Sequence, residues 1–194
     1  MKEKDLMGIP WRVAFALQDV GWYLRQDIIW HKPNPMPESV TDRCTKAHEY
    51  IFLLSKSAKY YYDHEAIMQE SICKDDKRNG KWNIIYEGKR TGQNGGGQHS
   101  FVTINDKANK RSVWTVTTKP FKEAHFATFP EDLIMDCIKA GCPEGGIVLD
   151  PFMGAGTTAL VSRKLDRKYI GFELNPEYIA IAEKRLRNEL GIFL

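Results

Sequence analysis

Two glycines and one glutamate carry the clearest chemical signal in this sequence. Gly154 and Gly156 lie in a turn that follows the apolar run Ile147–Leu149 and precedes Thr157. Glycine permits a tight turn and lets a ligand approach the backbone, and the helix expected after the turn offers free N–H groups to an anion. Glu173 ends the next apolar run, 19 residues after Gly154, where its carboxylate can accept hydrogen bonds from both ribose hydroxyls of a nucleoside. The arrangement predicts a nucleoside-cofactor site.

The residues alone leave two cofactors open. The run Gly154–Ala159 fits the G-x-G-x-x-G/A pattern of dinucleotide-binding turns. S-adenosylmethionine fits as well. Its carboxylate can bind to the turn, its ribose can bind to Glu173, and its sulfonium can lie against a nearby aromatic ring. A tight turn that binds no ligand is the third interpretation, and a carboxylate in register at Glu173 argues against it.

Alternating strands and helices are expected to hold this turn in place. The patterns predict a buried strand at 146–150 and a second strand at 168–173, with a helix at 157–165 between them. Further helices are expected from Pro130 to Gly141 and from Pro176 to about residue 190. Two strands joined through a helix call for a parallel sheet. The sequence therefore predicts an α/β fold for residues 113–194.

The first third of the chain is also well patterned. A helix is expected from Leu6 to Leu17, strands at 27–31 and 48–55, and a weaker strand at Tyr60–Tyr62. Three prolines within residues 33–37 end the first of these strands. We treat residues 1–66 as one segment of the protein.

The segment 67–112 differs from both of its neighbours. It is rich in glycine and lysine and shows little periodicity. Residues 74–122 contain 11 Lys and Arg against 4 Asp and Glu, in a chain whose net charge is only +3. A basic insert in an otherwise acidic body predicts contact with a polyanion.

Composition sets the broad class. The 194 residues are 42% hydrophobic and 27% charged, which excludes a disordered tail or a fibre. No run approaches the roughly 20 apolar residues of a membrane-spanning helix, and the charged start Met1–Asp5 shows no secretory signal. The four cysteines form no C-x-x-C pair, so we expect reduced thiols in a cytoplasmic protein and no metal site.

Several motifs together resemble the DNA amino-methyltransferases, which methylate N4 of cytosine or N6 of adenine. Residues 150–158 resemble the cofactor motif of that family. Other resemblances are the segment before that motif (125–130), two late strands with their loop (30–37 and 46–52) and the ribose-binding strand end (171–178). The cofactor motif comes after the segments that resemble the catalytic half, as in the β group of the family.

The resemblance implies a Rossmann-like methyltransferase sheet of seven mostly parallel strands, S-adenosylmethionine as cofactor, and double-stranded DNA as partner. The residues that it implies at the cofactor are His125, Phe126, Phe129, Asp150, Pro151, Phe152, Gly154, Gly156, Thr157 and Glu173. The resemblance implies that His125, Phe126 and Phe129 flank the methionine end and that Glu173 binds the ribose. The residues that shape the turn are Asp150, Phe152, Gly154, Gly156 and Thr157. Segment 67–112 occupies the place of the target-recognition region. Candidate DNA contacts are Lys32, Asn34, Lys77, Arg78, Lys81, Lys89, Arg90, Lys110 and Arg111.

The sequence departs from the family at the catalytic tetrapeptide, Asp/Asn/Ser-Pro-Pro followed by an aromatic residue. The chain contains no Pro-Pro dipeptide, and Asn34–Pro37 is only a partial likeness without the aromatic. No catalytic residue is therefore assigned, and the sheet is expected to lack its central strands. We expect the C-terminal portion of a restriction-modification methyltransferase, inactive alone and completed by an N-terminal chain.

The target base stays open between two amines. The strand and loop motifs favour N4 of cytosine, with N6 of adenine as the alternative. A non-catalytic cofactor-binding or DNA-binding subunit of a split methyltransferase is a further alternative. A dinucleotide-dependent oxidoreductase is disfavoured, because the sequence shows only one strand-helix-strand unit.

Overall fold

The computed structural model describes residues 2–71, 107–119 and 128–191. Residues 1–67 and 111–194 form one compact unit, and residues 68–110 form a second. Some sequence predictions fall outside the described residues. These are His125, Phe126, Lys77, Arg78, Lys81, Lys89 and Arg90.

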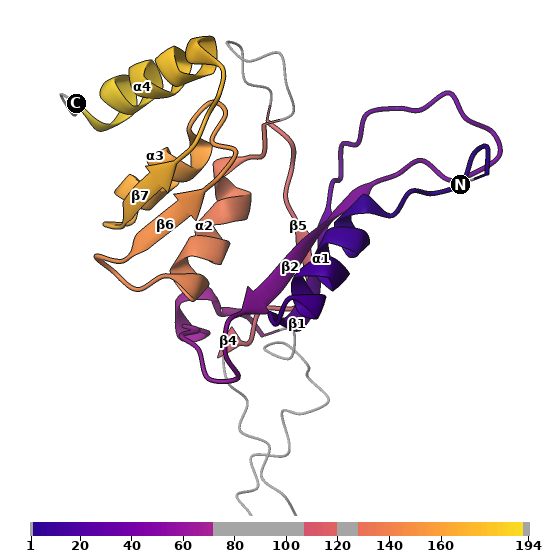
Figure 1. The fold of residues 1–194 in the computed structure, drawn as a ribbon, viewed down its shortest axis with the longest axis horizontal. Coiled ribbons are helices and arrows are strands. Elements are labelled where there is room, and N and C mark those ends of the chain that lie inside the picture. The colour runs from indigo at the N-terminus through magenta and orange to yellow at the C-terminus, as the bar shows by residue number, and fades with distance from the viewer. Residues whose placement is uncertain (1, 72–106, 120–127, 192–194) are drawn as a thin grey trace, which may run out of the picture. The chain divides into compact units, whose positions relative to one another are not determined.

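The predicted strand-helix-strand unit is confirmed. Strand β6 (Ile147–Asp150) pairs in parallel with β7 (Lys168–Gly171), and α3 (Thr157–Lys164) connects them. Figure 1 shows the two strands side by side, followed by α4 (Pro176–Leu190). The Asn175 side chain caps α4 by accepting a hydrogen bond from the Glu177 N–H at 2.9 Å.

Helix α3 is the centre of the core around these strands. It packs against β7, α4 and α2 (Glu131–Gly141). Leu160 is 0% exposed and forms a buried cluster with Ala159 and Leu186. Because α3 follows the glycine turn directly, this core fixes the orientation of the helix N-terminus at the predicted cofactor site.

A second sheet has the strand order β2-β1-β5. Strand β1 (Tyr23–His31) is antiparallel to β2 (His48–Ser55) and parallel to β5 (Val113–Thr115). Helix α1 (Ile9–Asp19) precedes this sheet in the chain and contacts β1. The predicted helix and both main strands of the first third are thus confirmed.

Two tryptophans anchor this second sheet to α2. Trp30 of β1 and Trp114 of β5 are buried together with Ile28 and with Leu133 of α2. Both indole N–H groups are satisfied, because Trp30 donates to the Val116 carbonyl and Trp114 to the Arg111 carbonyl. The helix that begins after Pro130 therefore belongs to both cores.

Three local predictions differ from the structure. Strand β1 begins at Tyr23, four residues before the predicted start, because pairing with β2 extends it through polar residues. The predicted weak strand at Tyr60–Tyr62 is wrong, since these residues are exposed and irregular. Strand β5 was not predicted, because only three residues form it and its partner β1 lies far away in sequence.

The prediction that β6 is buried is also wrong. Ile147 and Leu149 are each 60% exposed. The reason is that β6 pairs only with β7 within the described residues, and the two sheets share no strand there. The structure thus agrees with a parallel sheet that is incomplete.

The second unit contains one short antiparallel pair, β3 (Gln69–Glu70) with β4 (Lys107–Ala108). A single 3-10 turn, η1 (Glu65–Ile67), precedes it in the first unit. Within the described residues, no helix combines the length and the apolar character needed to cross a membrane.

Candidate cofactor site

The glycine turn has a backbone that requires glycine at two positions. Gly154 has φ +52° and Gly156 has φ +76°, both in the left-handed region. At Gly154 an added Cβ would meet nothing within 4 Å, whereas at Gly156 it would lie 2.9 Å from the Ala182 Cβ. Gly154 therefore leaves open space beside the backbone, and Gly156 lets α4 pack closely on the start of α3.

The carboxylate of Asp150 organises the turn from inside. One oxygen accepts the N–H of Phe152 at 2.9 Å, and the other accepts the hydroxyl of Thr158, which is buried. These bonds join the end of β6 to the first turn of α3. In the structure Asp150 therefore shapes the turn that the sequence singled out.

Glu173 points at the glycine turn. Its Oε2 accepts the N–H of Gly154 at 2.9 Å, and its Oε1 accepts the N–H groups of Leu174 and Asn175, both at 2.8 Å. The bond from Asn175, helped by those from Gly154 and Leu174, lowers the pKa of Glu173 below its ordinary value of 4.5. The group is ionised at neutral pH.

Glu173 retains capacity for a further donor. An ionised carboxylate offers about four lone-pair positions, and three backbone N–H groups occupy positions here. The remaining position is on Oε2, beside the turn. It can accept one hydroxyl directly, and a second hydroxyl would have to replace the N–H of Gly154.

Large apolar side chains surround this edge of the parallel strands without being buried. Phe152 is 87% exposed, Phe172 60% and Leu174 100%. They follow the carboxyl ends of β6 and β7, the edge where ligands bind in open α/β sheets. Exposed apolar surface next to an ionised carboxylate matches a nucleoside, which has a flat ring and a polar sugar.

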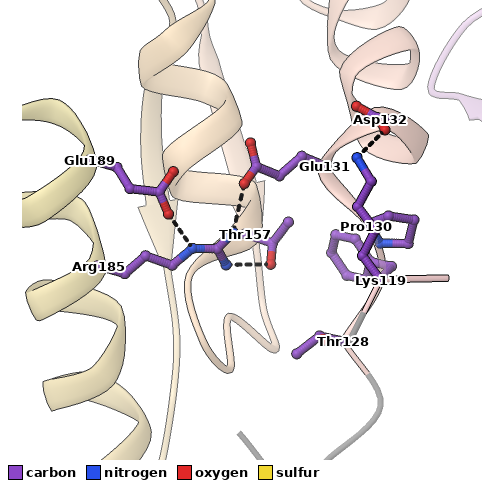
Figure 2. Close-up of a pocket in the computed structure, with 9 residues that line it drawn as sticks. Lys119, Thr128, Pro130, Glu131, Asp132, Thr157, Arg185 and Glu189 are labelled. Carbon is purple, nitrogen blue, oxygen red and sulfur yellow. Dashed lines mark hydrogen bonds and ion pairs between the residues drawn. The ribbon is translucent and has the colours of Figure 1, made fainter. Parts of the chain in front are cut away.

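Phe129 lies just before α2 and close to Thr157, the first residue of α3. It packs against the tryptophan core and lines a cavity of about 340 Å³ together with Pro130 and Thr157. Figure 2 shows this cavity, with Thr157 on one side and the segment from Thr128 to Asp132 on the other. The structure thus brings the start of α2 and the glycine turn to one cavity.

A second cavity, of about 480 Å³, is lined by β6, whose other edge has no partner strand among the described residues. Its lining comes mostly from β6 and α2, with Thr158 of α3, and is mostly apolar. The residues are Phe129, Ile134, Cys137, Ile138, Gly141, Cys142, Ile147, Val148, Leu149, Asp150 and Thr158. An exposed strand edge beside an apolar groove is a ready place for another strand.

The described DNA-contact candidates are held by other parts of the protein. Lys32 forms an ion pair with Glu49 and lies 4.4 Å from the Trp30 ring centre. The Asn34 amide accepts the N–H of Thr118 at 3.1 Å and donates to its carbonyl at 3.3 Å. These bonds shape the proline loop. Lys110 is half-buried and Arg111 is exposed, at the two sides of the boundary between the units.

Comparison with known proteins decides the family. A family model described as DNA methylase, for N6 and N4 methyltransferases, matches residues 1–184. The chain belongs to this DNA methylase family. This chain is 50% identical over 189 residues to the type II methyltransferase M.Cfr9I of Citrobacter freundii, covering 97% of this chain and 53% of that protein. It is 48% identical over 186 residues to M.SmaI of Serratia marcescens, covering 96% and 54%.

Solved structures show the same fold. The cytosine-N4-specific PvuII DNA methyltransferase matches with a TM-score of 0.67 at 21% identity, over 95% of this methylase and 59% of that chain. The M1.HpyAVI complex with S-adenosylmethionine matches with a TM-score of 0.60 at 24% identity, over 94% and 71%. The predicted methyltransferase fold is therefore confirmed. The chain spans about half the length of the curated relatives it matches.

The sequence interpretation missed part of this site. Arg185 and Glu189 of α4 line the smaller cavity with Glu131 of α2, and Leu174 is fully exposed beside Glu173. Leu174 could have been noticed, because an apolar residue directly follows the carboxylate. The α4 pair gave no signal, since charged residues four positions apart are ordinary on a helix surface.

Proposed function

We propose that this methylase forms the S-adenosylmethionine-binding portion of a site-specific DNA methyltransferase, acting in the cytoplasm within a restriction-modification system. The complete enzyme transfers a methyl group to an exocyclic amine of a DNA base. The carrying observation is the junction between Glu173 and the glycine turn, where an ionised carboxylate meets the Gly154 N–H at 2.9 Å. When bound, S-adenosylmethionine supplies a methyl group on a positively charged sulfur.

The residues present fit this cofactor. Glu173 binds a ribose hydroxyl through its remaining acceptor position, and the exposed side chains of Phe172 and Leu174 offer apolar contact to a base. The N-terminus of α3 offers N–H groups and a partial positive charge to a carboxylate. Phe129, with His125 and Phe126 before it, flanks the methionine end.

The chain contributes to the reaction by positioning. An exocyclic amine is a poor nucleophile, because its lone pair is delocalised into the ring, and the base must leave the duplex at a cost of about a few kcal/mol. A binding site that orients the methyl group toward the amine supplies much of the rate gain. We assign no covalent nucleophile and no metal to this step.

The proposed target amine is N4 of cytosine, with N6 of adenine as the alternative. A solved relative in fold is named cytosine-N4-specific, and the strand and loop motifs favour the same base. Nucleoside mass spectrometry of methylated DNA separates the two products. Detection of N6-methyladenine alone would refute the N4 proposal.

Segment 67–112 is proposed to be the target-recognition insert that binds double-stranded DNA. Residues 1–66 are proposed as the C-terminal half of the catalytic subdomain and residues 113–194 as the S-adenosylmethionine-binding subdomain. The lysines and arginines of the insert give the chain a strongly basic region, which contacts phosphates and makes binding salt-dependent. Replacing Lys77, Arg78 and Lys81 by Gln should weaken DNA binding and flatten its dependence on salt. Unchanged affinity and salt slope would contradict this role.

The free edge of β6 is proposed to receive a parallel strand from the remaining part of a complete methyltransferase. The edge is apolar at Ile147 and Leu149, an apolar cavity of about 480 Å³ lies beside it, and the relatives are about twice as long. That part also supplies the catalytic Pro-Pro-aromatic motif.

Co-expression tests this docking. We expect methylation when this chain is produced with the part of M.Cfr9I to which it has no match, and none from the chain alone. Leu149→Lys should abolish the restored activity, whereas Val20→Lys, at an exposed position outside the cavity, should not. Methylation by the purified chain alone would refute the need for a complement.

Calorimetric titration tests the cofactor. We expect the purified chain to bind S-adenosylmethionine and not NAD. Glu173→Gln removes the charge with little change of shape and should weaken binding by about tenfold, or 1.4 kcal/mol. The matched control is Glu183→Gln on the outer surface of α4, where Glu183 pairs with Arg187. Binding of NAD alone would overturn the proposal.

A further inference from the structure

A closed ring of four charges joins three helices next to the glycine turn. Arg185 of α4 donates to Glu131 of α2 at 2.8 Å and to Glu189 of α4 at 3.1 Å. Lys164 of α3 donates to the second oxygen of the same two carboxylates, at 2.8 Å and 2.9 Å. Each carboxylate therefore bridges Arg185 and Lys164, and the four charges cancel.

The guanidinium of Arg185 has a further partner in the turn itself. Its Nη1 donates to the hydroxyl oxygen of Thr157 at 3.0 Å, and Figure 2 shows Arg185 reaching Glu131, Glu189 and Thr157 at once. Thr157 is buried and directly follows Gly156. One side chain thus holds the first residue of α3 and the first residue of α2.

The ring is partly shielded from solvent, with Glu131 26%, Lys164 35% and Glu189 38% exposed. The Arg185 side chain is 10% exposed. Burial raises the pKa of Glu189, but bonds from Lys164 and Arg185 outweigh it and lower that pKa overall. Burial lowers the pKa of Lys164, and the bonds to Glu131 and Glu189 raise it overall. Lys164 and Glu189 therefore stay charged at neutral pH.

We propose that Arg185 is a positioning residue for the cofactor site. It fixes the separation between Phe129–Pro130 at the start of α2 and the turn that ends at Thr157, the two walls of the 340 Å³ cavity. The inference rests on the proposed function, because it assigns this cavity to the cofactor. Only arginine suits the position, since three acceptors lie around one planar group, whereas a lysine ammonium on a flexible stem has no such fixed geometry.

Cofactor affinity of the full chain provides the test. Arg185→Gln should weaken S-adenosylmethionine binding by about tenfold in calorimetry, equivalent to 1.4 kcal/mol, and Arg185→Lys should recover little of the loss. Thr157→Val removes one of the three bonds of Arg185 from the other side; because Thr157 also lines the cavity, this variant is assessed by hydrogen exchange and not by affinity. The control is Arg187→Gln, which breaks an exposed pair with Glu183 on the same helix.

Hydrogen exchange of the unliganded chain separates positioning from general stability. Arg185→Gln should lose amide protection at Leu133, Gly154 and Gly156, whose N–H groups are hydrogen-bonded at the start of α2 and in the turn, while the core of α3 around Leu160 keeps it. If Arg185→Gln does not fold, Thr157→Val carries the hydrogen-exchange test, because it removes the bond between Arg185 and the turn. Affinity within twofold of the wild type in folded Arg185→Gln, or equal loss of protection everywhere, would overturn the inference. A wild-type chain that does not bind S-adenosylmethionine would instead refute the proposed function.

Discussion

Replacing Gly156 by alanine should destabilise the methylase far more than the same change at other left-handed glycines. At φ +76° an alanine costs about 1–2 kcal/mol in backbone strain. The new Cβ would also lie 2.9 Å from the Ala182 Cβ, and overpacking of this kind costs about 1–3 kcal/mol. The expected loss is therefore about 2–5 kcal/mol in the free energy of unfolding.

Two further variants separate the contributions. Gly191→Ala has a similar φ of +62° but meets nothing within 4 Å, so it should cost only the strain of about 1–2 kcal/mol. Adding Ala182→Gly to Gly156→Ala should recover the free energy of unfolding lost to overpacking. The recovery is reduced by about 1 kcal/mol, because a glycine inside α4 is itself destabilising. Urea denaturation measures each difference. If Gly156→Ala costs no more than Gly191→Ala, the close approach of α3 and α4 is not as described.

Three other perturbations test the same structure. Leu160→Ala should cost about 2–5 kcal/mol in urea denaturation, because the side chain is 0% exposed, whereas Leu174→Ala should change stability by less than about 0.5 kcal/mol; equal effects would contradict the described core. Since the folded pKa of Glu173 lies below 4.5, its ionised form stabilises the fold at neutral pH, and this contribution falls as the pH drops through the folded value. The stability difference between wild type and Glu173→Gln should therefore shrink below about pH 4.5; a difference that grows on acidification would refute the bonding of the carboxylate. Asp150→Asn should loosen the turn and raise amide exchange at Phe152, and unchanged exchange would show that the carboxylate is dispensable there.

Much of the cofactor half could be predicted from local sequence patterns. The apolar run before Asp150, the two glycines and Glu173 lie within one strand-helix-strand unit, whose pairing follows from sequence order. Asn175 and Pro176 mark the start of α4 by their own chemistry. Local signals of this kind do not depend on distant partners.

The parts that escaped prediction depend on distant partners. Strand β5 has three residues and forms by pairing with β1, so no periodicity in the sequence indicates it. The apolar run of β6 indicates burial, yet its side chains are exposed because only one neighbouring strand is present among the described residues. The role of Arg185 comes from three helices that meet in space. A sequence pattern shows which residue types are present but not which distant residues contact one another in the fold.

The indole of Trp30 donates to a carbonyl 86 positions further along the chain. Closing so large a loop carries an entropic cost that grows with the logarithm of its length, whereas β6, α3, β7 and α4 contact one another within a continuous stretch. Contacts between near neighbours in sequence form faster than distant ones. We therefore expect the segment from β6 to α4 to fold first, with β1 and β5 pairing later. A destabilising substitution in the Leu160 core should then slow folding of the whole chain, whereas one at Trp114 should chiefly speed its unfolding.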